Sequence, residues 1–373
     1  MKKHDNNVKA FFALIRAGLW EKDVKLLPFG KIDYSAIYKL AEEQSVVGLV
    51  AGGLEHVTDA KVSKETILQF VGSTLQIEQQ NKAMNTYVAR LIELLRKNDI
   101  YALLVKGQGI AQCYEKPLWR ATGDIDLFLS NDNYKKAKDL LIPNVYKIDE
   151  EDVKRQHLSM TIESWVVELH GTLRSGLWKT VDKGLDDIQR AVFYDGKVRS
   201  WLNGKTQIFL PKPDEDIIFV FSHILQHFYK EGIGLRQICD WCRLIWTYKG
   251  KVDRKLLEQR LKSMGVMTEW KAFSSLAVNY LGMPVEAFPF YSDSRKWSRK
   301  ADKIMDFILE TGNFGHNRDL SYMQSRPYII RKLISLWRHT ADSLRYFFIF
   351  PLDSLMVWCV KVRMGFMSLV LNK

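Results

Sequence analysis

The chain has 373 residues, 47% hydrophobic and 26% charged, which suffices for a sizeable core and favours more than one subdomain. No apolar signal-like stretch opens the sequence, and no run of 18 apolar residues that would span a membrane occurs. Together with only four cysteines, this predicts a cytoplasmic protein in a reducing compartment. The net charge of +12 favours an acidic partner: a nucleotide, a nucleic acid or an anionic membrane surface.

The first quarter of the chain is predicted to be helical. Apolar residues recur every three or four positions over residues 8–19, 34–43 and 63–97. Residues 46–54 are also apolar, but three glycines there predict a weak or broken helix.

A sharp strand-to-helix turn follows. The apolar run 101–105 predicts a short buried strand, and it is cut by the segment Lys106-Gly107-Gln108-Gly109 before helical spacing resumes. Two glycines allow a ligand to approach the backbone, and the free N–H groups of a new helix favour an anion. The turn therefore predicts a phosphate site.

Two acids open the next strand. In residues 125–129 the period of two places Asp124 and Asp126 on one face and Ile125 on the other. Neighbouring carboxylates repel each other, so a divalent cation is their expected partner.

The following elements are mixed. A helix is predicted at 131–141, with strands at 145–148, 157–162 and 165–169, and the last strand places Glu168 and His170 on one face. Pro211-Lys212-Pro213 marks a boundary, after which helical spacing dominates. The expected division is an N-terminal helical segment 1–98, an α+β core 99–210 and a helical C-terminal domain 211–373.

Several motifs together resemble a bacterial family of the polymerase-beta-like nucleotidyltransferases that is labelled "uncharacterised nucleotidyltransferase". These are Val105-Lys106-Gly107, Tyr114, Pro117, Arg120, Gly123-Asp124-Ile125-Asp126-Leu127 and, later, Val167-Glu168-Leu169-His170. The resemblance implies an α+β fold with a small mixed sheet. It also implies transfer of a nucleoside monophosphate from an NTP such as ATP, with release of pyrophosphate.

The resemblance assigns roles to residues of this chain. It implies that Asp124, Asp126 and Glu168 bind Mg²⁺ (or Mn²⁺), and that Glu168 assists the attacking hydroxyl. Phosphate contacts fall on Lys106, Gly107, Gln108, Gly109 and Arg120, although Gln108 replaces the hydroxyl of the superfamily's usual Gly-Ser. On the acceptor side it implies His223, Arg236 and Asp240. His170 is expected to orient Glu168 or to contact phosphate, with a hydrogen-bonded structural histidine as the alternative.

Each of these residues has a simpler alternative. Arg120 can form a salt bridge with a local acid, and Arg236 can pair with Asp240 four residues on. His223 and His227, with Cys239 and Cys242, have the spacing of a zinc site, whereas core packing of the cysteines is the competing interpretation.

The acceptor is left open among a small molecule, a saccharide, RNA and protein, and the oligomeric state is open too. Residues 328–373 mix basic and aromatic side chains, which suits a membrane surface but more often packs on protein. The alternatives to an enzyme are a non-catalytic nucleotide-binding or regulatory partner of the same fold, and a nucleic-acid-binding protein.

Overall fold

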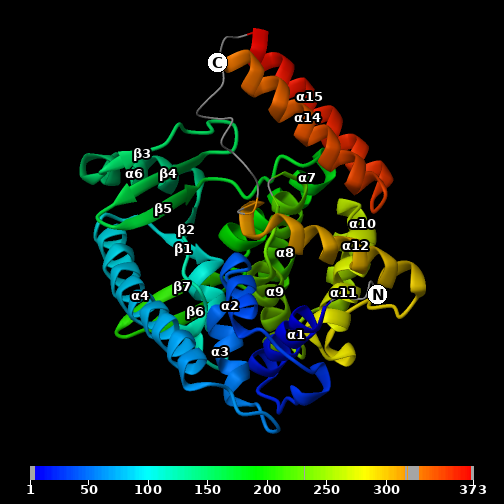
Figure 1. The fold of residues 1–373 in the computed structure, drawn as a ribbon. Coiled ribbons are helices and arrows are strands. Elements are labelled where there is room, and N and C mark those ends of the chain that lie inside the picture. Colours follow the sequence, from blue (N-terminus) through cyan, green and yellow to red (C-terminus); the bar gives the residue numbers. More distant parts are fainter. Residues whose placement is uncertain (1–4, 231, 316, 318–326, 371–373) are drawn as a thin grey trace.

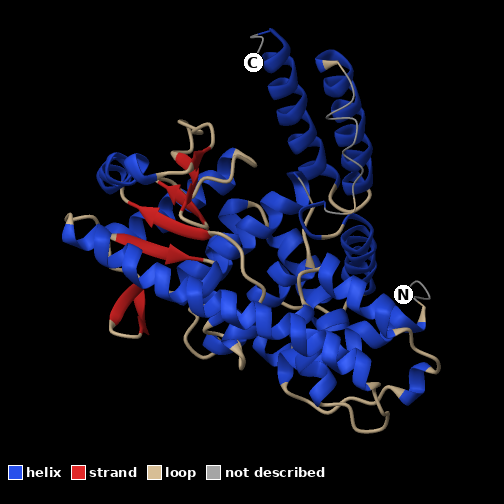
Figure 2. Ribbon diagram, turned by 60° about the vertical axis from the view of Figure 1, so that its left-hand side comes forward, coloured by secondary structure: helices blue, strands red, loops and turns tan. Residues whose placement is uncertain are grey.

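The computed structural model describes residues 5–230, 232–315, 317 and 327–370, and its architecture is α+β (Figure 1). A mixed sheet lies beside a larger body of helices, and a pair of helices at the C-terminal end projects from that body (Figure 2). The α+β class predicted from the sequence is confirmed.

One sheet of seven strands holds the central third of the chain, in the order β3-β4-β5-β2-β1-β7-β6. Its strands are β1 (Ala102–Val105), β2 (Ile125–Leu129), β3 (Lys147–Ile148), β4 (His157–Ile162), β5 (Trp165–His170), β6 (Val198–Asn203) and β7 (Thr206–Pro211). β2 pairs antiparallel with β1 and parallel with β5, so it lies at the centre of the sheet.

The alternation of side chains gives the sheet two different faces. The face carrying Ile125, Leu127 and Leu129 packs on the long helix α4 (Lys64–Lys97) and on α6 (Asn131–Leu141) in one buried cluster. The opposite face carries Asp126, and its apolar residues join the cluster of the helical body, which includes α7 (Lys179–Tyr194) and α8 (Pro213–Lys230). The polar positions of this second face therefore point toward the helices that follow the sheet.

The helical body is built from both ends of the chain. Its further helices are α1 (Asn6–Trp20), α2 (Tyr34–Glu43), α3 (Val47–Glu55), α9 (Leu235–Tyr248), α10 (Arg254–Met264), α11 (Met267–Leu281) and α12 (Arg295–Thr311). One buried cluster joins α1–α3 to α8–α12 and to the second sheet face. The division at residues 98 and 210 therefore stays a prediction.

A weak or broken helix was predicted at 46–54, and the structure shows that the helix is not broken. α3 is a continuous helix, and its glycines make close contact with α1 and the loop before β2 rather than weakening it. A Cβ on Gly53 would collide with the backbone of Leu14, and one on Gly18 would collide with that of Leu49. Bare backbones at this crossing let the two helices approach more closely than larger side chains allow.

The last two helices, α14 (Tyr328–Phe347) and α15 (Pro351–Val370), form an antiparallel pair that is anchored at its turn. Tyr346 and Phe350 are buried against Phe228 of α8. Along the pair, Trp337 and Phe348 are 75% and 72% exposed. Every helix in the part of the chain that the structure describes is too short or too polar to cross a lipid bilayer.

Substitution of Gly53 by alanine should destabilise the protein, because the new methyl group has only backbone atoms of α1 to displace. Overpacking of this kind costs about 1–3 kcal/mol in the free energy of unfolding. The matched control is Gly72→Ala on the exposed side of α4, where a Cβ meets nothing within 4 Å. Alanine at position 72 should raise the free energy of unfolding by roughly 0.5–1 kcal/mol, because alanine favours a helix more than glycine does. Urea unfolding of both variants checks the pair, and equal effects would contradict the close α1–α3 contact.

Candidate active site

Three carboxylates converge at the centre of the sheet. The parallel register of β2 and β5 sets Asp126 opposite Glu168, and Asp124 precedes β2 by one residue on the same face. Carboxylate oxygens of Asp124, Asp126 and Glu168 all lie within 4.8 Å of one another. Hard cations such as Mg²⁺ prefer this all-oxygen donor set.

The electrostatics of the cluster favour a bound cation. Repulsion from Asp126, together with burial, raises the pKa of Asp124. Asp126 is 1% exposed, and its Oδ2 is buried with no hydrogen-bond partner among the described residues. A buried acceptor without a donor costs free energy unless something positive meets it. The residues present therefore fit the divalent ion that the sequence predicted.

In this structure the ammonium group of Lys106 supplies part of the missing charge. Its Nζ lies 2.6 Å from Asp126 Oδ1. Burial lowers the pKa of Lys106, but the charges of Asp126, Asp124 and Glu168 outweigh burial and raise it. The backbone at Lys106 has φ 57° and ψ −146°, a conformation that favours glycine. The strand-to-helix turn thus holds a strained residue in order to aim its side chain at the acids.

Two histidines from neighbouring strands complete the acid cluster. His170 Nε2 lies 2.8 Å from Asp126 Oδ1, and His157 Nε2 lies 3.1 Å from Glu168 Oε2. Burial raises the pKa of Glu168, yet the hydrogen bonds of His157 and His170 outweigh it and hold the pKa well below the ordinary range. Glu168 is therefore an ionised carboxylate.

Helix α8 lines the opposite side of the site with another histidine pair. His223 Nε2 is 3.4 Å from Lys106 Nζ and 3.0 Å from His227 Nε2. Burial, followed by the charge of Lys106, lowers the pKa of His223 well below its usual value. His223 is consequently neutral beside the ammonium group.

Arg120 and Asp240 form a buried, bidentate ion pair between the loop before β2 and helix α9. Arg120 Nε and Nη2 each donate to Asp240 at 2.7 Å, and the Tyr114 hydroxyl donates to the same carboxylate at 2.7 Å. Arg120 thus forms a salt bridge, as the alternative interpretation of the sequence expected. Its acid, however, is 120 residues away and not local. Asp240 is engaged by Arg120 instead of Arg236.

Arg236 binds a backbone carbonyl group and keeps one guanidinium nitrogen without a hydrogen-bond partner among the described residues. Its Nη1 donates to the carbonyl of Thr122 at 2.7 Å, while its Nε is buried with no hydrogen-bond partner among the described residues. Burial lowers the pKa of Arg236, and the neighbouring charge of Arg120 lowers it further. An incompletely paired guanidinium next to Asp124 and Gly123 is a suitable contact for an anion.

The residues of the glycine turn are not equivalent. Gly107 has φ +41° and lines the cavity of the site. Gln108 is buried and its Nε2 donates to Asn81 Oδ1 of α4 at 2.6 Å. The N–H of Gly109 donates to the carbonyl of Lys106, and a Cβ at Gly109 would collide with Leu210. The side chain of Gln108 and the N–H of Gly109 are therefore engaged within the protein, and the direct phosphate contact predicted for them stays a prediction.

A cavity of about 380 Å³ connects these groups. This is within the size range of small-ligand sites. Its acids, histidines and cations come from the sheet, from α8 and α9 and from the loops at 155 and 172–174. They are Asp124, Asp126, Glu168, Asp240, His157, His170, His223, His227, Lys106, Arg120, Arg155, Arg174 and Arg236.

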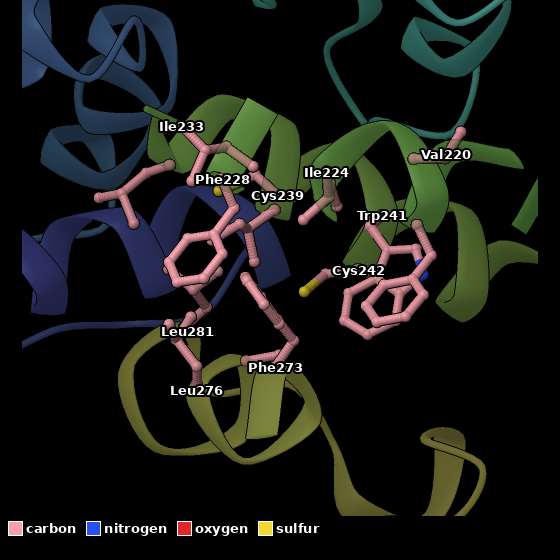
Figure 3. Close-up of a cluster of buried hydrophobic side chains, with 14 of the residues drawn as sticks. Val220, Ile224, Phe228, Ile233, Cys239, Trp241, Cys242, Phe273, Leu276 and Leu281 are labelled. Atoms are coloured by element: carbon pink, nitrogen blue, oxygen red, sulfur yellow. The ribbon is translucent and has the colours of Figure 1, made fainter. Parts of the chain in front are cut away.

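The spacing that resembles a zinc site does not produce one. Cys239 and Cys242 are fully buried in the apolar core beside Phe228, Trp241 and Phe273 (Figure 3). Among the described residues, the groups with metal-ligand spacing are Asp124–Asp126–Glu168 and His157–Glu168–His170. The core-packing interpretation of the cysteines is therefore the one that the structure supports.

Of the charged side chains and histidines that line the cavity, sequence reasoning missed His157, Arg155 and Arg174. His157 stands on a predicted strand, but its place opposite His170 depends on the pairing of β4 with β5. The two arginines lie outside the strands, and no spacing or motif marks them.

Replacing Asp240 by alanine should strongly destabilise the chain, because it leaves the guanidinium of Arg120 buried without its counter-charge. Breaking one partner of a buried pair costs about 3–5 kcal/mol in the free energy of unfolding. Asp186→Ala removes the partner of Arg174 in an exposed pair and should cost less than about 1 kcal/mol. Chemical denaturation of both variants compares them, and a small loss for Asp240→Ala would contradict a stabilising role of the buried Arg120–Asp240 pair.

Comparison with known proteins agrees with this geometry. Residues 30–282 match the family model described as "Uncharacterised nucleotidyltransferase". No curated protein and no solved structure gives a significant match. The family match spans more than half of the chain, and within it lie the glycine turn, the three acids and the Arg120–Asp240 pair. The chain belongs to this nucleotidyltransferase family.

Proposed function

We propose that this protein transfers a nucleoside monophosphate from an NTP to a hydroxyl or phosphate acceptor, in a reaction that depends on a divalent metal ion. The observation that carries the proposal is the convergence of Asp124, Asp126 and Glu168, with the buried Oδ2 of Asp126 lacking a donor. Family membership supports nucleotidyl transfer in general. The choice of Mg²⁺ or Mn²⁺ follows from the oxygen donors.

Each acid has a distinct part in this proposal. Asp124 and Asp126 hold the ion, which when bound clamps the triphosphate and stabilises charge on the reacting oxygens. Glu168, already ionised, accepts the proton of the attacking hydroxyl or contributes to the same ion. Its position beside the other two acids favours an enzyme over a binding or regulatory partner of the same fold.

The basic side chains of the cavity are assigned to the phosphates. The Nε of Arg236 is buried without an acceptor among the described residues. Arg155 and Arg174 border the same space, and their ion pairs with Asp152 and Asp186 are partly exposed, unlike the buried pair of Arg120. Lys106 is already close to the acids and can transfer its contact from Asp126 to phosphate oxygens. Arg120 acts indirectly, because Asp240 occupies its guanidinium.

The reaction conserves charge and atoms in a simple way. The acceptor oxygen forms a bond to the α-phosphorus, the bond from that phosphorus to the bridging oxygen breaks, and pyrophosphate leaves. The acceptor's proton passes to Glu168. Positioning of the two oxygens on opposite sides of the phosphorus is the contribution expected from the fixed strands β2 and β5.

The protein incubated with Mg²⁺, cell extract and NTPs labelled at the α-phosphorus should transfer the label to an acceptor, whereas a label at the γ-phosphorus should leave in pyrophosphate. Asp126→Asn should abolish the transfer, since it removes a ligand charge. Glu168→Gln should lower the rate roughly 10²–10⁴-fold if the carboxylate accepts the proton.

The control for both variants is Asp132→Asn, an exposed acid in the first turn of α6, which should keep the wild-type rate. Transfer of the γ-label instead of the α-label would indicate phosphoryl transfer and reject the proposal. NTP binding without any labelled product would favour the non-catalytic alternative.

A further inference from the structure

Two imidazole nitrogens converge on a single oxygen of Glu168. His157 Nε2 lies 3.1 Å from Glu168 Oε2, and His170 Nε2 lies 3.5 Å from the same atom. The two rings are 4.7 Å apart between centroids, and all three ligand atoms lie within 4.8 Å of one another.

The two distances to Glu168 Oε2, 3.1 Å and 3.5 Å, are those of neighbouring ligands around one metal ion. Bonds of about 2.0–2.2 Å to nitrogen and oxygen, at tetrahedral or octahedral angles, place neighbouring ligand atoms roughly 3.0–3.5 Å apart.

The sheet holds the three groups in place. His157 is paired with His170 in the antiparallel register of β4 and β5, and Glu168 is two residues before His170 on the same face. Sites built on strands are held more precisely than sites built on loops. Asp126 Oδ1, 2.8 Å from His170 Nε2, supplies a further oxygen at the edge of this group.

The donor set differs in kind from the carboxylate site beside it. Two imidazoles and a carboxylate suit zinc, cobalt, iron or nickel, whereas magnesium prefers oxygen and retains water. We propose that His157, Glu168 and His170 form a second metal site, selective for a divalent transition-metal ion, which shares Glu168 with the site of Asp124 and Asp126.

Binding of this ion is independent of nucleotidyl transfer, but a part in catalysis would rest on the proposed function. With Glu168 shared between both sites, the second ion would lie next to the acid that faces the acceptor. As a ligand of both ions, Glu168 would then act through the second ion, which would stabilise the deprotonated acceptor oxygen, instead of taking up the acceptor's proton itself.

The test is titration of metal-free, full-length protein with Co²⁺, followed by visible absorption, in the presence of excess Mg²⁺. Wild type should bind one Co²⁺ that Mg²⁺ does not displace. His157→Ala should weaken this binding at least about tenfold. Loss of a group that only orients a ligand already costs about tenfold in metal affinity, and His157 is proposed as a direct ligand. Asp124→Asn should retain the signal, since Asp124 is not a ligand of this site.

His56→Ala is the matched control, because His56 is an imidazole bonded to the carboxylate of Glu21 away from the cavity. It should leave Co²⁺ binding unchanged. His157→Gln provides a second variant, and circular dichroism of each protein shows whether it is folded. Equal Co²⁺ affinity in wild type and both folded His157 variants, or complete displacement by Mg²⁺, would overturn the inference.

The outcome separates the two proposals. Loss of Co²⁺ binding in His157→Ala without any nucleotide transfer in wild type would support the metal site and reject the proposed function. Nucleotide transfer with Mg²⁺, together with Co²⁺ affinity that is unchanged in the His157 variants, would support the proposed function and reject the second metal site.

Discussion

The parallel pairing of β2 with β5, in the register that sets Asp126 against Glu168, is the constraint on which the rest of the site depends. It brings negative charges together at a mostly buried place, and the repulsion of Asp126, together with burial, raises the pKa of Asp124. Such a cluster is stable only with positive charge beside it. Lys106 supplies that charge here, His170 adds a hydrogen bond to Asp126, and the divalent ion that we propose would add further positive charge.

Helices on both sides of the sheet hold the loop that leads into the acid cluster. Asn81 of α4 donates to the carbonyls of Leu118 and Arg120, so the long helix fixes the loop that leads into the acids. On the other side, Asp240 of α9 binds the side chain of Arg120. The loop is thereby held between two helices, and the cavity lies where α8 and α9 face the sheet. Helices α1 and α3, which are in close contact with each other, belong to the same buried cluster as α8 and α9.

Local pattern predicted much of the fold, since period and polarity suffice to place short strands. The predicted strands 125–129 and 157–162 have the observed bounds of β2 and β4, and the shared face of Glu168 and His170 follows from the period of two. The helix α3 was misjudged because the effect of its glycines depends on α1, which no local pattern includes.

The side-chain partners within the site likewise depend on tertiary structure. Gln108 lies in the predicted turn, but its direction is set by Asn81 of a different helix. The partner of Arg120 and the contribution of His157 depend on tertiary pairing, which the spacing of residues along the chain does not encode. The sequence therefore indicated which chemistry to expect, whereas tertiary contacts determine which side chains lie together in the cavity.

The most direct measurement is a crystal structure of the full chain with Mg²⁺ and a non-hydrolysable NTP. The account predicts an ion about 2.0–2.1 Å from oxygens of both Asp124 and Asp126 and in contact with the triphosphate. It also predicts that the ammonium group of Lys106 has left Asp126. A nucleotide bound elsewhere, or bound in the cavity while Lys106 remains on Asp126 and no ion touches the acids, would contradict it.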